Sequence, residues 1–181
     1  MYQLRGKLSI VMPAYNEETL IYNSIMQTLS IVEQFAPDME IIAVNDGSKD
    51  KTKQEIERAI RDDEKQPHRV TAGMTVSKTR VKLVTSNKNR GKGNAIIAGV
   101  SQAEGDYIAF VDADLELNPA QLEGYLKKMQ ESGSDVVIGC KFHKDSELHY
   151  PFVRKVISLG YYMMLLGLFH LNVRDLSLIH I

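Results

Sequence analysis

The sequence predicts an α/β fold in which a doubly wound, mostly parallel sheet is flanked by helices. Short, continuous apolar runs are typical of strands that are buried on both faces of a sheet. Segments with helical spacing separate these runs, so that strand and helix alternate between residues 8 and 139. Most connections between these segments are short, and the alternation predicts helical crossovers of right-handed sense between parallel strands.

The composition is that of one ordinary globular domain. The chain has 181 residues, of which 44% are hydrophobic and 25% are charged. Its net charge of −1 gives no reason to expect nucleic acid as a partner. The single cysteine, Cys140, rules out an internal disulfide and fits a reducing compartment. The first apolar run is too short for a signal peptide, so we expect a cytoplasmic protein.

The first three strand–helix units share one pattern. Apolar runs predict strands at residues 8–12, 39–44 and 81–85. A polar turn follows each run. Helices are then predicted at about 17–35, with Asn16 as the N-cap and apolar residues at helical spacing, at 50–61, where the helix is polar, and at 94–103. Residues 62–80 show no clear period, and we interpret them as an exposed excursion between the second helix and the third strand.

The last predicted units contain the most informative turn. A fourth strand at residues 107–111 ends at Asp112 and Asp114, and an amphipathic helix follows at 120–131. A fifth strand is predicted at residues 136–139, before a basic loop.

Asp112 and Asp114 point to a bound cation. Two carboxylates this close repel each other, and a divalent cation removes the repulsion because hard cations take carboxylate oxygens. The alternative is a solvated turn ahead of a helix that begins at Asn118-Pro119.

Two other loops should meet this pair at the carboxyl edge of the sheet, where open α/β sheets bind ligands. They are residues 13–18 and 45–48. Each has a local explanation as a helix start or a turn, but their convergence favours a shared ligand. A nucleoside diphosphate would use them all: Tyr15 offers a face for a base, Asp46 accepts hydrogen bonds, and Arg90 and Lys92 supply positive charge beside a helix N-terminus.

A dinucleotide-binding fingerprint is a weaker interpretation. Gly91-Lys92-Gly93-Asn94-Ala95-Ile96 resembles the start of G-x-G-x-x-G, and Asp112 follows about 20 residues later. However, Ile96 replaces the third glycine, and the turn follows the third predicted strand instead of the first. The nicotinamide-dehydrogenase hypothesis is therefore disfavoured.

Four motifs together carry a family resemblance. They are residues 9–18 (SIVMPAYNEE), 44–48 (VNDGS), 89–95 (NRGKGNA) and 111–115 (VDADL). The chain resembles family-2 inverting glycosyltransferases of the GT-A fold, a Rossmann-like doubly wound sheet. Over about residues 7–175 it is most similar to polyprenyl-phosphate sugar transferases of the dolichyl-phosphate mannose synthase type.

The resemblance implies a metal-dependent hexosyltransferase. It would move mannose or glucose from GDP-mannose or UDP-glucose to a polyprenyl phosphate, with inversion. Mg²⁺ or Mn²⁺ would be held by Asp112, Asp114 and Glu116, and the two aspartates would be the catalytic residues. The nucleotide sugar would contact Pro13, Ala14, Tyr15, Glu17, Val44, Asp46, Lys92, Asp112, Ala113, Asp114 and Lys141.

The resemblance also divides the chain. It implies a nucleotide-sugar-binding GT-A domain at residues 1–149 and an apolar region at 150–175. We interpret that region as an interfacial helix that binds a membrane surface or the lipid acceptor, or else as a buried helix of the core. An interfacial helix would make the protein peripheral at the cytoplasmic face of the membrane.

The end of the chain departs from the family. Residues 176–181 replace the Thr-Gln-Thr-Gly-like segment of relatives, so we expect a truncated end with a non-family tail. Two alternatives to the lipid-phosphate transferase stay open. One is a family-2 transferase with a saccharide acceptor, and the other is a fragment that binds nucleotide sugar without turnover.

Overall fold

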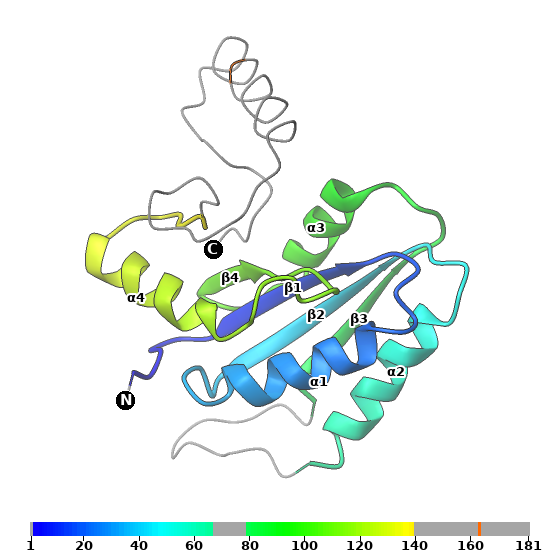
Figure 1. The fold of residues 1–181 in the computed structure, drawn as a ribbon, viewed down its shortest axis with the longest axis horizontal. Helices are drawn as coiled ribbons and strands as arrows, with labels where there is room; N and C mark the ends of the chain where they lie inside the picture. The colour runs from blue at the N-terminus through cyan, green and yellow to red at the C-terminus, as the bar shows by residue number, and fades with distance from the viewer. Residues whose placement is uncertain (1, 67–78, 140–162, 164–181) are drawn as a thin grey trace.

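The computed structural model describes residues 2–66, 79–139 and 163 (Figure 1). Lys141, the apolar region at 150–175 apart from Met163, and the tail at 176–181 lie outside the described residues. In the described part, strands and helices alternate in the order β1 (Leu8–Ala14), α1 (Ile21–Val32), β2 (Met39–Asp46), α2 (Thr52–Asp63), β3 (Val81–Ser86), α3 (Lys92–Val100), β4 (Tyr107–Phe110) and α4 (Gln121–Ser132).

The sheet has the strand order β3-β2-β1-β4, and every neighbouring pair is parallel. The chain therefore moves outward from β1 to β2 and β3, and then returns to place β4 on the other side of β1. A ligand site is expected at this reversal, beyond the carboxyl ends of β1 and β4.

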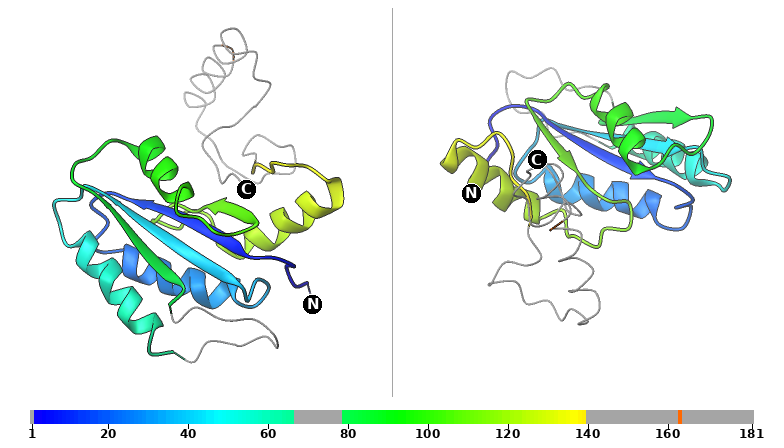
Figure 2. Two further views of the ribbon diagram at one scale, coloured as in Figure 1. Left: turned by 180° about the vertical axis from the view of Figure 1, so that it is seen from behind. Right: turned by 90° about the horizontal axis from the view of Figure 1, so that it is seen from above.

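Helices cover both faces of the sheet, as predicted for a doubly wound fold (Figure 2). Alternate residues of a strand point to opposite faces, so β1 contributes to two cores. Leu8, Ile10 and Met12 pack in one core with apolar residues of α1, α2 and α4. Val11 packs in the other core with Ala95 of α3.

Gly99 allows α3 to lie close to the sheet. A Cβ atom added at Gly99 would be 2.4 Å from Cγ1 of Val11 and 3.0 Å from Cγ2 of Val44. A larger residue would push α3 away from the ends of β1 and β2. The first residue of α3, Lys92, would then move relative to the ligand site.

The predicted exposed excursion contains a buried ion pair. Arg80 is 6% exposed, and its guanidinium donates to the carboxylate of Asp63 at 2.7 and 3.1 Å and to Glu33 at 2.8 Å. These contacts join the start of β3 to the ends of α2 and α1. Residues 67–78, between the partners, lie outside the described residues. The prediction of an exposed excursion at 62–80 is thus wrong at Asp63, which is buried at the end of α2, and at Arg80.

A second charged cluster lies at the amino ends of the strands. The carboxylate of Glu40 is buried, and it accepts from Ser9 Oγ at 2.6 Å and pairs with Lys82 Nζ at 2.8 Å. The exposed Glu104 pairs with Lys82 at 2.8 Å and with Lys7 at 2.9 Å. This cluster links β1, β2, β3 and the turn before β4.

The predicted fifth strand at 136–139 is not formed as a strand in the described part of the chain, where Ile138 is an isolated bridge residue. The run follows a left-handed turn at Gly133, and Val136 is 58% exposed. It is therefore not covered on both faces, which the prediction requires.

The helices of the part of the chain that the structure describes include none with the length and apolar character of a membrane-spanning helix.

Candidate functional site

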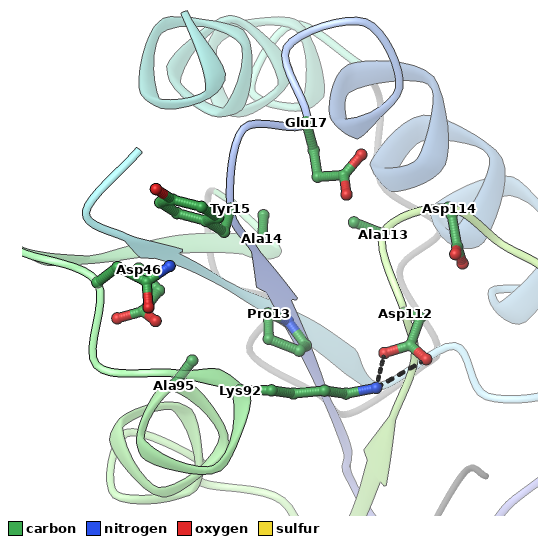
Figure 3. A pocket seen from close by; sticks show the side chains of 11 residues that line it. Pro13, Ala14, Tyr15, Glu17, Asp46, Lys92, Ala95, Asp112, Ala113 and Asp114 are labelled. Carbon is green, nitrogen blue, oxygen red and sulfur yellow. Dashed lines mark hydrogen bonds and ion pairs between the residues drawn. The ribbon is translucent and has the colours of Figure 1, made fainter. Parts of the chain in front are cut away.

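A cleft of about 340 Å³ lies at the carboxyl ends of β1, β2 and β4 (Figure 3). It occupies the reversal point of the sheet, between the two halves of the strand order. Its lining residues are Pro13, Ala14, Tyr15, Glu17, Asp46, Asn89, Lys92, Ala95, Asp112, Ala113 and Asp114. All of them except Asn89 and Ala95 are among the predicted site residues, so the structure brings most of the prediction into one place.

Two described residues of the predicted site do not line the cleft, and a third predicted residue is not described. Val44 is fully buried beneath α3, because alternate residues of β2 face opposite sides of the sheet. Glu116 does not line the cleft, and its backbone N–H donates to Oδ1 of Asp114 at 3.1 Å. Lys141 lies outside the described residues.

Two lining residues are absent from the predicted set. Asn89 and Ala95 are the ends of the glycine-containing motif at 89–95, which spans the turn after β3 and the first turn of α3, so the motif itself is the signal that could have identified them. The side chain of Asn89 accepts the N–H of Gly91 at 2.9 Å and closes the turn. Ala95 is buried and packs between the sheet and the cleft.

The loops after β1 and β2 are joined by five hydrogen bonds from backbone N–H groups to side chains. In order, the donors and acceptors are Asn16 to Ser48 (3.0 Å), Glu17 to Thr52 (2.8 Å), Glu18 to Asp50 (3.2 Å), Lys49 to Asn16 (2.9 Å) and Lys51 to Glu18 (2.8 Å). The side chains of Glu18 and Asp50 therefore hold the loops together. The side chain of Glu17 has no part in this network and faces the cleft (Figure 3).

Asp46 fixes the wall of the cleft that is formed by the end of β2 and the loop before α3. It is 3% exposed, and its carboxylate accepts the N–H of Arg90 at 3.0 and 3.1 Å and the N–H of Gly91 at 2.8 Å. Gly47 has φ +67°, and a Cβ there would be 2.3 Å from the carbonyl carbon of Lys88. The Asp46-Gly47 pair thus holds the loop before α3 against the end of β2.

Lys92 and Asp112 form an ion pair on the cleft wall (Figure 3). The Nζ atom of Lys92 is 2.6 Å from Oδ1 and 2.9 Å from Oδ2 of Asp112, so the ammonium contacts both carboxylate oxygens. The two side chains are 57% and 48% exposed. The pair joins α3 to the turn after β4.

Glu17 and Asp114 concentrate negative charge in the part of the cleft away from Lys92. Burial raises the pKa of the Glu17 carboxyl, and the charges of Asp114 and Asp50 raise this pKa further. The Glu17 carboxylate makes no hydrogen bond to any described residue. A cation between Glu17 and Asp114 would relieve the repulsion between their carboxylates.

Two residues beside the cleft adopt left-handed backbone conformations. Asn16 has φ +57° and Leu115 has φ +51°, and they are the only non-glycine residues with positive φ among those described. Asparagine tolerates this conformation, whereas leucine is strained by it. The aspartate turn therefore has a constrained backbone, as functional turns often do.

The carboxylates fit a cation that also takes oxygens from a bound ligand. Among the described residues, no group of three or more His, Cys, Asp or Glu side chains is placed to hold a metal alone. Mg²⁺ in nucleotide sites typically uses one or two carboxylates together with substrate phosphates and water. Asp112 and Asp114 supply that number of carboxylates, with Glu17 adding negative charge nearby.

The sequence of the chain matches one known protein family over most of its length. The sequence profile of glycosyl transferase family 2 matches residues 9–177, which is most of the chain. The chain belongs to glycosyl transferase family 2. The four motifs that carry the resemblance in the sequence all lie within this match.

Relatives of this family-2 chain include lipid-phosphate transferases. It is 32% identical over 152 residues to undecaprenyl-phosphate 4-deoxy-4-formamido-L-arabinose transferase of Photorhabdus laumondii, which covers 84% of this chain and 42% of that protein. It is 29% identical over 161 residues to dolichol-phosphate mannosyltransferase of Pyrococcus furiosus, covering 87% and 40%. The chain thus spans less than half the length of these relatives.

Solved structures confirm the fold of the family-2 chain. A mannosyltransferase from Pyrobaculum calidifontis, determined with GDP-Man and Mn²⁺, matches with a TM-score of 0.62 at 22% identity. The match covers 78% of this chain and 37% of the other. The described sheet and helices form the Rossmann-like α/β fold of GT-A glycosyltransferases, as predicted.

Proposed function

We propose that this chain carries the donor site of a metal-dependent hexosyltransferase that acts on a nucleotide sugar and a polyprenyl phosphate, with inversion. The observation that carries the proposal is the convergence of Tyr15, Asp46 and the Asp112–Asp114 turn on one cleft. The names of the relatives support a lipid-phosphate acceptor, since they include undecaprenyl-phosphate and dolichol-phosphate transferases.

The nucleoside would occupy the side of the cleft formed by β1 and β2. Tyr15 is 41% exposed on the rim, where its ring can stack on a base. Asp46 already accepts two backbone N–H groups, but a carboxylate has about four acceptor positions. Its remaining acceptor positions can receive an N–H of the base or a ribose hydroxyl.

The diphosphate would lie between Lys92 and the aspartate turn. The ammonium of Lys92 and the N–H groups at the start of α3 favour an anion there. A divalent cation held by Asp112 and Asp114, Mg²⁺ or Mn²⁺, would supply charge stabilisation for the departing diphosphate. The resemblance and the relative solved with GDP-Man and Mn²⁺ support this part of the proposal.

The acceptor is proposed to be a polyprenyl phosphate at the cytoplasmic face of a membrane. A phosphate oxygen is already anionic at neutral pH, so its attack on the anomeric carbon needs no strong general base. The apolar sequence at 150–172 supports a lipid-binding region.

The experiment is a transfer assay with two donors. The chain is incubated with radiolabelled GDP-mannose or UDP-glucose, polyprenyl phosphate and Mn²⁺, and the organic phase is counted. Label entering the organic phase supports the proposal. Label entering an added saccharide instead supports the alternative acceptor, and donor binding by calorimetry without any transfer supports a fragment that binds without turnover.

A further inference from the structure

We propose that Lys92 competes with the divalent cation for Asp112, so that the cation binds tightly only together with a nucleoside diphosphate that draws Lys92 away. This inference rests on the proposed donor site and specifies how its two ligands depend on each other. In it, Lys92 changes partner from a carboxylate to a phosphate.

The geometry of the ion pair makes the competition direct. Nζ of Lys92 lies 2.6 and 2.9 Å from the two carboxylate oxygens of Asp112. A cation bound by Asp112 must take at least one of these oxygens. The ammonium and a divalent cation would then be held within a few ångströms of each other, where their like charges repel. Lys92 therefore has to leave before Asp112 can bind the cation fully.

The ion pair is also easy to break. Both side chains are about half exposed, and exposed ion pairs are weak because water and salt screen the charges. Lysine carries a compact charge on a flexible stem, so the ammonium can move without a change in the backbone. An exchange of partners thus needs no rearrangement of the fold.

The cleft gives Lys92 one natural alternative partner. Among the described lining residues, Lys92 is the single cation, while Glu17, Asp46, Asp112 and Asp114 are acidic. Lys92 is the first residue of α3, where backbone N–H groups favour a bound phosphate. A diphosphate at this helix end would attract the ammonium and release Asp112. Binding of the nucleotide and of the cation would then strengthen each other to the same extent.

The test is a titration of the full 181-residue chain with Mn²⁺, with and without GDP or UDP, followed by electron paramagnetic resonance of free Mn²⁺. Protein-free titrations correct for Mn²⁺ bound by the nucleotide itself. The variants are Lys92→Met and the matched control Lys88→Met. Lys88 lies in the turn just before α3 and makes no ion pair with any described residue.

The proposal predicts that Lys92→Met raises the Mn²⁺ affinity without nucleotide and lowers the gain in Mn²⁺ affinity that the nucleotide produces. Without nucleotide, this variant should bind Mn²⁺ about fivefold more tightly than the wild type, because a competing positive charge is gone. The gain in Mn²⁺ affinity on adding GDP or UDP should shrink by at least about the same factor. Lys88→Met should stay within about twofold of the wild type in both titrations.

Several outcomes would overturn the exchange. One is a Lys92→Met variant that is folded by circular dichroism and binds Mn²⁺ alone no more tightly than the wild type. Another is a Lys92→Met variant whose Mn²⁺ affinity rises on adding GDP or UDP as much as that of the wild type. The third is a wild type whose Mn²⁺ affinity does not rise on adding GDP or UDP. These titrations use neither sugar donor nor lipid acceptor. If Lys92→Met shows both predicted effects on Mn²⁺ binding but the chain transfers no sugar, the proposed function alone is rejected. If the chain transfers sugar but Lys92→Met does not show both effects, the exchange of partners by Lys92 alone is rejected.

Discussion

The hydroxyl of Ser24 donates a hydrogen bond of 2.5 Å to the carbonyl oxygen of Ala113. Ser24 lies on α1 and is 4% exposed, and Ala113 is the residue between the two cleft aspartates. The same hydroxyl contacts the carbonyl of Leu20 at 3.1 Å. This contact ties the aspartate turn to the helix that follows the β1 loop, so the two walls of the cleft are positioned together.

Ser24→Ala should loosen the aspartate turn. It leaves the buried carbonyl of Ala113 without its partner, which should lower the free energy of unfolding by about 1–2 kcal/mol. It should also raise the KM for the nucleotide sugar at limiting Mn²⁺ with a smaller effect at saturating Mn²⁺. Chemical denaturation and steady-state kinetics measure the two effects.

The matched control is Thr28→Val, one turn further along α1. The hydroxyl of Thr28 is buried and has no hydrogen-bond partner among the described residues, so its removal should not lower stability or alter the KM. If Ser24→Ala and Thr28→Val behave alike, the contact with Ala113 has no positioning role.

Asp114→Asn should remove metal-dependent nucleotide binding and leave the fold intact. Loss of one carboxylate charge should weaken the binding of GDP or UDP in the presence of Mn²⁺ by about tenfold or more. Calorimetry with and without Mn²⁺ measures the difference. An Asp114→Asn chain with unchanged metal dependence would reject the role proposed for this residue.

Glu116→Gln tests the third predicted metal ligand. Glu116 does not line the cleft, and it contacts Asp114 through its backbone N–H. We therefore expect the Mn²⁺-dependent affinity for GDP or UDP to stay within about twofold of the wild type, since the charge is removed from an exposed position. A loss as large as that of Asp114→Asn would identify Glu116 as a metal ligand, as the sequence predicts.

Gly47→Ala should destabilise the wall that Asp46 holds. The left-handed backbone and the clash with Lys88 together should cost about 1–3 kcal/mol of unfolding free energy. Gly93→Ala is the control, because a Cβ there meets no atom within 4 Å and the residue lies in α3. Alanine is favoured over glycine within a helix, so Gly93→Ala should be neutral or stabilising. Equal effects of the two substitutions on the denaturation midpoint would contradict this account.

The charged cluster at the amino ends of the strands should make stability depend on acid pH. Hydrogen bonds from Lys82 and Lys7 lower the pKa of Glu104 from 4.5 to about 2. Burial raises the pKa of Glu40, but hydrogen bonds from Lys82 and Ser9 outweigh it, so this pKa is also lowered. A carboxyl with a lowered folded-state pKa contributes stability above its unfolded pKa and loses it as pH falls. The denaturation midpoint should therefore drop between about pH 4.5 and about pH 2.

Lys82→Met isolates this cluster. It should lower stability at neutral pH by about 1–2 kcal/mol, because the buried Glu40 carboxylate loses a partner. It should also flatten the acid dependence, because Glu40 and Glu104 no longer share a cation. The control is Lys53→Met, which removes an exposed lysine whose Nζ lies 3.8 Å from Oε1 of Glu57. It should change neither the stability at neutral pH nor its dependence on acid pH. If the denaturation midpoint of Lys82→Met falls with pH in parallel with that of the wild type, the cluster is not the source of the acid dependence.

The sequence alone was sufficient for the fold and for most of the candidate site. Apolar runs and helical spacing are local signals, and they identified the described strands and helices to within a few residues. The loops at 13–18, 45–48 and 112–114 could be placed together because parallel strands direct their carboxyl ends to one edge. Sequence periodicity failed at 136–139, where apolar residues alone do not establish that a run is covered on both faces.

Only the tertiary structure decided which partner each polar side chain takes. The sequence predicts that Asp46 contacts a nucleoside, and the fold shows that its carboxylate accepts the backbone N–H groups of Arg90 and Gly91. Lys92 contacts Asp112, 20 residues away, and Ser24 contacts Ala113, 89 residues away. Such contacts depend on distances between elements that are remote in the chain. Local patterns determine which elements form, whereas packing of the whole sheet and its helices determines which of their side chains meet.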